Sequence, residues 1–144
     1  MIPKPKARHF SAAKITDSVA EYYGTVLKSK RDLKTNACTS CSKPPPRLQA
    51  LINKVPEAII ERFYGCGTPL PPGGLEGLCV LDLGSGSGRD SYVAAQLVGP
   101  TGKVIGIDMT DEQLALARKH ADTFCASLGY KSTNMTFVKG FIEE

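Results

Sequence analysis

Three short apolar runs alternate with two helical patterns between residues 78 and 139, and this alternation is the strongest constraint on the fold. Short runs that are apolar throughout are typical of strands in a parallel sheet that is buried on both faces. The runs occupy residues 78–83, 103–107 and 135–138, and the helical patterns occupy residues 90–98 and 110–128, the second beginning with a capping-box pattern at 110–113. We therefore expect an α/β fold with three parallel strands joined through helices.

The first half of the chain is organised differently. Apolar residues recur at helical spacing between residues 15 and 27, and two shorter helical patterns follow a polar stretch at residues 34–43. Residues 68–77 contain three prolines and three glycines, a composition that is typical of a connector. We therefore predict an N-terminal helical segment with cysteine loops over residues 1–77, followed by an α/β domain over residues 78–144.

A glycine-rich turn, Gly-Ser-Gly-Ser-Gly at residues 84–88, joins the first predicted strand to the helix after it. Glycines at such a turn let the backbone approach a ligand closely, and the N–H groups at the start of the helix point towards that ligand. Asp108 follows Gly88 by twenty residues, at the end of the second strand, where a carboxylate can accept hydrogen bonds from ribose hydroxyls. A dinucleotide fingerprint requires a glycine where Arg89 stands, so the turn predicts a different nucleotide-type cofactor.

The turn and the acid before it, Asp82-x-Gly84-x-Gly86-x-Gly88, resemble the first motif of the S-adenosylmethionine-dependent methyltransferases. The resemblance implies a Rossmann-like class I methyltransferase sheet, of which this chain supplies the first three parallel strands. It also implies that Asp82 contacts the amino-acid end of the cofactor, that Asp108 binds its ribose and that Met109 packs on its adenine. The residues implied in cofactor binding are Asp82, Gly84, Ser85, Gly86, Gly88, Asp108, Met109, Phe141 and Ile142.

A set of longer segments narrows the resemblance to the arsenite methyltransferases. These segments are Glu-Tyr-Tyr-Gly at 21–24, Leu-Lys-Thr-Asn-Ala-Cys at 33–38, Phe-Tyr-Gly-Cys-Gly at 63–67, residues 81–90, and Gly-Ile-Asp-Met-Thr at 106–110. The resemblance implies an enzyme that transfers a methyl group from S-adenosylmethionine to trivalent arsenic bound by cysteine thiolates, here Cys38 and Cys66. It further implies arsenite or its thiol conjugates as substrate, thioredoxin or glutathione as thiol reductant, and a monomer.

The five cysteines are an odd number in a chain without a signal peptide, which argues against a disulfide framework. The resemblance implies Cys38 and Cys66 as the catalytic thiols, and soft thiolates suit a soft, thiophilic centre such as arsenic(III). Cys41 forms a Cys-x-x-Cys pair with Cys38, for which half of a zinc site and a redox pair are the alternatives. Cys79 and Cys125 fall in a predicted strand and on the inner face of a predicted helix, so we expect both to be small buried hydrophobes.

Charge and hydropathy argue against several other classes. The formal net charge is +4, and the basic side chains are dispersed through helical patterns without the aromatic motif of an RNA-binding sheet. We interpret them as solvated surface and expect no nucleic-acid partner. No apolar run approaches the length of a spanning helix, and no apolar segment follows the basic residues near the N-terminus. We therefore expect no membrane contact and a cytoplasmic location.

The three predicted strands are fewer than the sheet of the resembling family contains, and that family has further cysteines beyond the third strand. We therefore expect the N-terminal portion of an arsenite methyltransferase, with little or no activity alone. Two alternatives stay open at this point. One is another small-molecule S-adenosylmethionine-dependent methyltransferase in which the cysteines are incidental, and the other is a non-catalytic truncated product.

Overall fold

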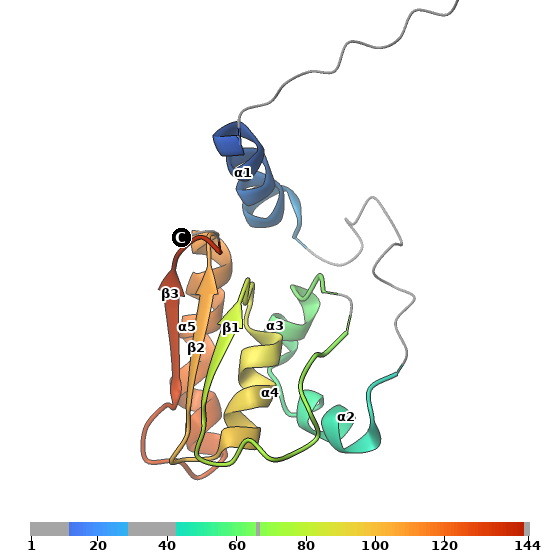
Figure 1. The fold of residues 1–144 in the computed structure, drawn as a ribbon, viewed down its shortest axis with the longest axis vertical. Helices are drawn as coiled ribbons and strands as arrows, with labels where there is room; N and C mark the ends of the chain where they lie inside the picture. The colour runs from blue at the N-terminus through green and yellow to red at the C-terminus, as the bar shows by residue number, and fades with distance from the viewer. Residues whose placement is uncertain (1–11, 29–42, 66, 143–144) are drawn as a thin grey trace, which may run out of the picture.

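The computed structural model describes residues 12–28, 43–65 and 67–142. Over these residues it contains one three-stranded sheet with helices on one side, and the helical segment comes before the sheet in the chain (Figure 1). The elements in chain order are α1 (Ala12–Glu21), the π-helix η1 (Tyr22–Val26), α2 (Pro46–Ile52), α3 (Glu57–Glu61), β1 (Cys79–Leu83), α4 (Arg89–Val98), β2 (Lys103–Asp108), α5 (Asp111–Ser127) and β3 (Met135–Lys139).

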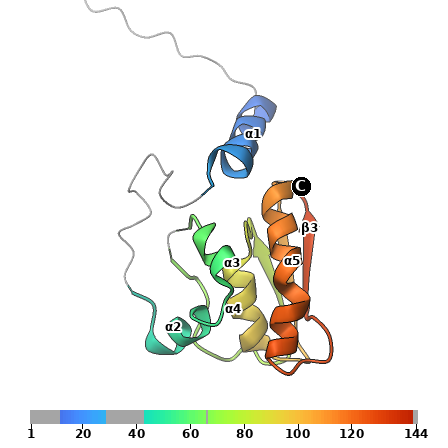
Figure 2. The same ribbon diagram turned by 180° about the vertical axis from the view of Figure 1, so that it is seen from behind.

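The sheet has the order β1-β2-β3, and both strand pairs are parallel. Leu81 is in register with Ile105, which is in register with Thr136. Helices α4 and α5 connect consecutive strands, and both lie on the same face of the sheet, as the views from the front and from behind show (Figure 1, Figure 2). The predicted α/β fold, with three parallel strands and a preceding helical segment, is therefore confirmed.

The hydrophobic core lies between the sheet and the helices on its covered face. Tyr92 of α4 is 0% exposed, and the centroid of its ring lies 4.9 Å from that of Phe124 on α5. Helices α2 and α3 extend the same core through Leu48, Ile52 and Ile59. Helices α2 and α3 are thus packed against the sheet domain, and residues 63–65 after α3 line a cavity together with the turn that follows β1.

The other face of the sheet is exposed in the described part of the chain. Leu81, Leu83 and Val138 are 55%, 53% and 44% exposed, and Cys79 at the edge strand β1 is exposed as well. The predictions that the sheet is buried on both faces and that Cys79 is buried are therefore wrong for these residues, whereas Cys125 is buried as predicted. The apolar pattern predicts side chains that can be buried, but it does not specify what covers them. Both crossover helices pack on the opposite face of the sheet, so these side chains are exposed.

Helix α1 and η1 lie beyond the carboxyl ends of the strands (Figure 1). Gly24 of η1 packs closely on the start of α5, because a Cβ at this position would lie 2.7 Å from a carboxylate oxygen of Glu112 and 2.9 Å from Cγ2 of Thr110. Leu27, which follows η1, is 0% exposed. Within the described ranges, no helix has the length and apolar character needed to cross a membrane.

Candidate functional site

The glycine-rich turn lies at the carboxyl end of β1 and is bonded to the neighbouring strand. The carbonyl oxygen of Ile107 on β2 accepts the N–H groups of Gly84 and Ser85, at 2.8 and 2.9 Å. Gly84, Gly86 and Gly88 have φ angles of +73°, +55° and +94°, which L side chains rarely adopt. The turn therefore presents backbone rather than side chains to the space beyond the strands.

Asp108, the last residue of β2, joins the turn to the start of α5. Its Oδ2 accepts the N–H of Gly86 at 2.8 Å, and its Oδ1 accepts the N–H of Thr110 at 2.8 Å. Thr110 makes no side-chain capping bond at the start of α5, so the predicted capping box at 110–113 is wrong. Each carboxylate oxygen has more than one lone pair, so Asp108 can accept further hydrogen bonds from a ligand.

Two cavities open beside Asp108. The larger has a volume of about 280 Å³ and the smaller about 220 Å³. Four residues line both of them: Val19, Gly84, Asp108 and Met109. A ligand that occupied both cavities would therefore pass the Asp108 carboxylate.

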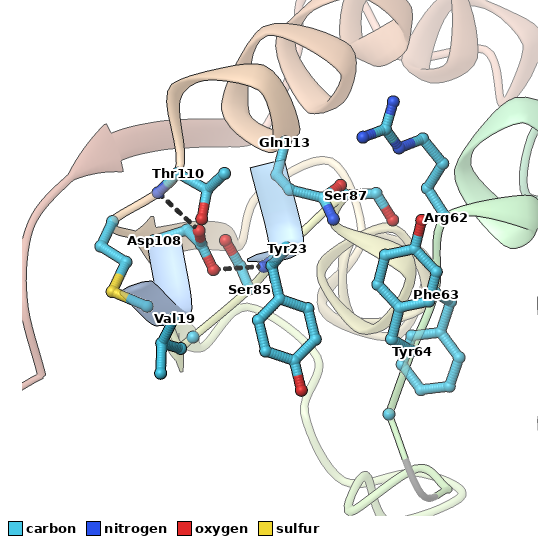
Figure 3. A pocket seen from close by; sticks show the side chains of 14 residues that line it. Val19, Tyr23, Arg62, Phe63, Tyr64, Ser85, Ser87, Asp108, Thr110 and Gln113 are labelled. Carbon is cyan, nitrogen blue, oxygen red and sulfur yellow. Dashed lines mark hydrogen bonds between the residues drawn. The ribbon is translucent and has the colours of Figure 1, made fainter. Parts of the chain in front are cut away.

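The larger cavity lies between the glycine turn and two aromatic segments from the first half of the chain (Figure 3). Residues 85–87 line one side, and Tyr23 of η1 lines another together with Phe63 and Tyr64, which follow α3. The ring centroids of Tyr23 and Tyr64 are 6.0 Å apart, and the Tyr64 hydroxyl donates a hydrogen bond to the carbonyl oxygen of Leu27 at 3.1 Å. These contacts join η1 and the residues after it to the segment that follows α3, although the two are distant in sequence.

The smaller cavity has a mainly apolar lining. Met109 at the end of β2, Phe141 and Ile142 after β3, and Val19 of α1 contribute to it. Phe141 and Ile142 are 37% and 64% exposed, so both are accessible to a ligand. A mainly apolar cavity that is also lined by the acidic residue Asp108 suits a ligand that carries a flat apolar ring on a polar sugar.

Asp82 lies on β1, two residues before the turn, and lines neither of the two cavities. Ser91 donates a hydrogen bond to its Oδ2 at 2.6 Å. Burial raises the pKa of Asp82, the hydrogen bond from Ser91 lowers it in part, and the negative charges of Asp90 and Asp108 raise it further. A cationic ligand group near Asp82 would stabilise the ionised carboxylate, so this position favours a positively charged ligand.

Replacing Asp82 with asparagine is expected to raise the free energy of unfolding at pH 7. Because the pKa of Asp82 is raised in the folded state, ionisation of its carboxyl destabilises the fold above that pKa. The gain from Asp82→Asn should therefore shrink as the pH falls through the raised pKa, and vanish below the unfolded value of 3.8. Urea denaturation of both proteins between pH 7 and pH 4 measures this gain. Asp122→Asn, at an exposed position, is the control. A gain in the free energy of unfolding of Asp82→Asn that did not depend on pH would contradict this explanation.

Arg89, the first residue of α4, connects the segment after α3 to the glycine turn. It is 8% exposed, and its guanidinium carbon lies 3.4 Å from the centroid of the Phe63 ring. Its Nη2 donates a hydrogen bond to the carbonyl oxygen of Gly67 at 2.5 Å. Beside it, the Ser87 hydroxyl donates to the carbonyl oxygen of Ile59 at 2.9 Å. The segment that carries Phe63 is therefore held against the glycine turn, and both line the larger cavity.

Most of the residues implied in cofactor binding line these cavities. Those that do are Gly84, Ser85, Gly86, Asp108, Met109, Phe141 and Ile142. Asp82 lines neither cavity, and neither does Gly88, where a Cβ would lie 3.0 Å from the ring of Phe137. The structure thus gives Gly88 a packing reason for its identity that the motif alone does not reveal.

The candidate thiols Cys38 and Cys66, together with Cys41, lie outside the described residues. The neighbours of Cys66 are described. Gly65 lines the larger cavity, and the carbonyl oxygen of Gly67 is bonded to Arg89.

Sequence reasoning assigned no site role to four polar residues that line the larger cavity: Arg62, Ser87, Thr110 and Gln113. Thr110 and Gln113, whose pattern predicted a capping box, are 4% and 2% exposed. The available signal was the position of Gln113, four residues before Ala117 and therefore on the inner face of α5. A polar side chain on an apolar helix face marks a site that needs a polar partner.

Known proteins with similar sequences are methyltransferases. Residues 75–144 match a family model described as a methyltransferase domain. An arsenite methyltransferase from Aquipseudomonas alcaligenes is 49% identical over 128 residues, which are 89% of this chain and 36% of the relative. The arsenite methyltransferase from Homo sapiens is 45% identical over 133 residues, which are 92% of this chain and 35% of the relative.

A solved structure agrees with these relatives. The crystal structure of an arsenic(III) S-adenosylmethionine methyltransferase from Chlamydomonas reinhardtii has 55% identity and a TM-score of 0.68 over 70% of this chain and 34% of that chain. The present chain spans about a third of the length of the curated relatives it matches. On its fold and its sequence, the chain contains a methyltransferase domain over residues 75–144, and the curated relatives that it matches are arsenite methyltransferases.

Proposed function

We propose that this chain is part of an arsenite methyltransferase and that it binds S-adenosylmethionine across the two cavities. The observation that carries the proposal is the position of Asp108, which lines both cavities and whose carboxylate accepts the N–H of Gly86 in the glycine turn. The curated arsenite methyltransferases, at 49% and 45% identity, support the choice of substrate. In this proposal the adenine enters the smaller cavity, the ribose lies beside Asp108 and the amino-acid end enters the larger cavity.

The residues present fit this cofactor part by part. Met109, Phe141 and Ile142 offer apolar contact to an adenine, and Asp108 offers charged acceptors to ribose hydroxyls. A Cβ at Gly86 would meet no atom within 4 Å, so the turn has open space in front of it. Asp82, whose pKa is raised by burial, favours a cationic group, and S-adenosylmethionine carries both an ammonium and a sulfonium.

Cys38 and Cys66 are the proposed ligands of the arsenic substrate. Each thiol that binds arsenite replaces one hydroxide, and its proton leaves with that hydroxide as water. The bound cofactor supplies a sulfonium methyl group, to which the arsenic lone pair bonds as the S–C bond breaks and leaves its electron pair on sulfur. No general base is needed, so the contribution of the chain is to position the reactants. Thioredoxin or glutathione is the proposed source of reducing thiols.

The first test titrates the 144-residue chain with S-adenosylmethionine and, separately, with arsenite. We expect calorimetric binding of both ligands. Cys38→Ser and Cys66→Ser should each weaken arsenite binding at least about tenfold, because the second thiolate of a chelate acts at high effective concentration. Exposed Cys79→Ser is the matched control and should leave the affinity unchanged. Unchanged arsenite affinity in both single variants would exclude these thiols as ligands.

The second measurement follows transfer of a labelled methyl group to arsenite in the presence of a thiol reductant. We expect little turnover from the 144 residues alone, because the outer edge of β1 and one apolar face of the sheet are exposed. Binding of S-adenosylmethionine without any binding of arsenite would instead favour a methyltransferase for another small molecule.

A further inference from the structure

Arg89 occupies a position that disfavours a cation. It is the first residue of α4, and the N-terminal end of a helix carries a partial positive charge. The residue is also 8% exposed, and burial of a charged group costs free energy unless that group is paired and hydrogen-bonded. An arginine at this position is therefore stable only through specific partners, and those partners indicate what it holds in place.

The guanidinium of Arg89 has three such partners among the described residues. Asp90 Oδ1 accepts hydrogen bonds from Nε at 3.1 Å and from Nη2 at 2.7 Å, which balances the charge. The carbonyl oxygen of Gly67 accepts a hydrogen bond from Nη2 at 2.5 Å, and the Phe63 ring centroid lies 3.4 Å from the guanidinium carbon. Two of the three partners therefore belong to the short segment of residues 63–67.

This segment is also folded closely on the Phe63 ring. A Cβ at Gly65 would lie 2.5 Å from Cζ and 2.7 Å from Cε2 of Phe63, so the backbone at Gly65 is in close contact with the ring. Gly65 and Gly67 are the residues on either side of Cys66 in the sequence. Both neighbours of this thiol are therefore connected to Arg89, Gly65 through the Phe63 ring and Gly67 directly.

The start of α4 is at the same time the end of the glycine turn. Gly88 immediately precedes Arg89, and Ser87 donates a hydrogen bond to the carbonyl oxygen of Ile59 on α3 at 2.9 Å. The turn and the segment after α3 are thus joined at two nearby positions, Ser87 and Arg89. A methyl transfer by direct displacement requires donor and acceptor at a fixed separation, and this connection can provide it.

We propose that Arg89 is a positioning residue for the arsenic substrate, which holds residues 63–67 and with them the Cys66 thiol at a fixed place relative to the glycine turn. This inference rests on the proposed function, in which Cys66 is an arsenic ligand. Arg89 itself contacts neither arsenic nor the cofactor in this proposal and acts through Cys66. A planar guanidinium suits this role because it can stack on a ring while it donates to a carboxylate and a carbonyl oxygen.

The test is a double-mutant cycle on the full 144-residue chain. Calorimetry measures arsenite binding to the wild type, Arg89→Met, Cys66→Ser and the double variant, with a phosphine reductant that adds no competing thiol. We expect Arg89→Met to weaken arsenite binding about three- to tenfold, because a less restrained Cys66 thiol has a lower effective concentration at the arsenic atom. In the Cys66→Ser background the same change should alter the affinity by less than about twofold, since the group through which it acts is absent.

Leu48→Ala is the control that is matched in stability. Leu48 of α2 is 2% exposed and lines neither cavity, and its truncation is expected to destabilise the fold by an amount similar to that of Arg89→Met. It should leave the affinity for arsenite unchanged. If Arg89→Met does not fold, Arg89→Lys keeps the charge without the planar group and is expected to show the same pattern with a smaller loss.

Three outcomes would overturn the inference while leaving the proposed function in place. One is wild-type affinity for arsenite in both Arg89 variants. Another is an equal loss from Arg89→Met with and without Cys66, and the third is an equal loss from Leu48→Ala, since either indicates a general effect on the fold. Wild-type affinity for arsenite in Cys66→Ser would instead contradict the role of this thiol in the proposed function itself.

Discussion

Replacing Asp108 with alanine is expected to weaken binding of S-adenosylmethionine at least about a hundredfold. A hydrogen bond to a charged group contributes about 1.5–3 kcal/mol, and in the proposed complex the carboxylate accepts one from each of two ribose hydroxyls. The change also removes the acceptors of the Gly86 and Thr110 N–H groups, which loosens the turn and the start of α5. Calorimetric titration of both proteins measures the loss.

Asp111→Ala is the matched control for this prediction. Asp111 lies three residues further along the chain, in the first turn of α5, and its side chain is 67% exposed. The substitution by alanine removes the same charge as it does at Asp108. Its affinity for S-adenosylmethionine should stay within about twofold of the wild type, since exposed charges interact weakly with their surroundings. If Asp108→Ala and Asp111→Ala lost the same small factor, Asp108 would not contact the ligand.

Replacing Arg89 with methionine is expected to lower the free energy of unfolding by about 3 kcal/mol, the cost of removing one member of a buried ion pair. The guanidinium packs on the Phe63 ring, donates to the carbonyl oxygen of Gly67 at 2.5 Å and pairs with Asp90 at 2.7 Å. Methionine preserves apolar contact with the ring but leaves both oxygens without their donor. Urea denaturation monitored by circular dichroism measures the change.

Arg118→Met serves as the control, because Arg118 also donates to a backbone carbonyl oxygen, that of Phe137, from an exposed position on α5. It should cost less than about 1 kcal/mol. Arg89→Lys retains the charge but loses the planar guanidinium that stacks on the Phe63 ring and donates several hydrogen bonds at once. We therefore expect Arg89→Lys to restore only part of the stability that Arg89→Met loses. Full recovery by lysine would show that charge alone matters at this position.

Much of the fold and part of the site could be predicted from the sequence. Strand and helix positions followed from local periodicity, and the structure places each predicted strand within a residue or two of its expected range. The glycine turn and Asp108 were found by their spacing, and the structure brings Gly86 and Asp108 into hydrogen-bond contact. Spacing succeeded here because the carboxyl ends of adjacent parallel strands meet at one edge of the sheet.

Other features depended on partners that a local pattern does not specify. Residues 110–113 have the letters of a capping box, but the Asp108 carboxylate accepts the Thr110 N–H, and Gln113 is buried. Cys79 belongs to an apolar strand, yet it is exposed because the crossover helices α4 and α5 pack on the opposite face of the described sheet. In each case the pattern predicted the correct helix or strand but did not specify which residues pack against it.

The sequence by itself determined the order of the elements, the parallel sheet and the link between the glycine turn and Asp108, since these depend on periodicity and on short spacings along the chain. Only the tertiary structure decided what encloses the site. The Tyr23 and Tyr64 rings lie side by side in the lining of the larger cavity, and Arg89 packs on the ring of Phe63. Such contacts join segments remote in sequence, and their free energy arises from packing that no local pattern encodes.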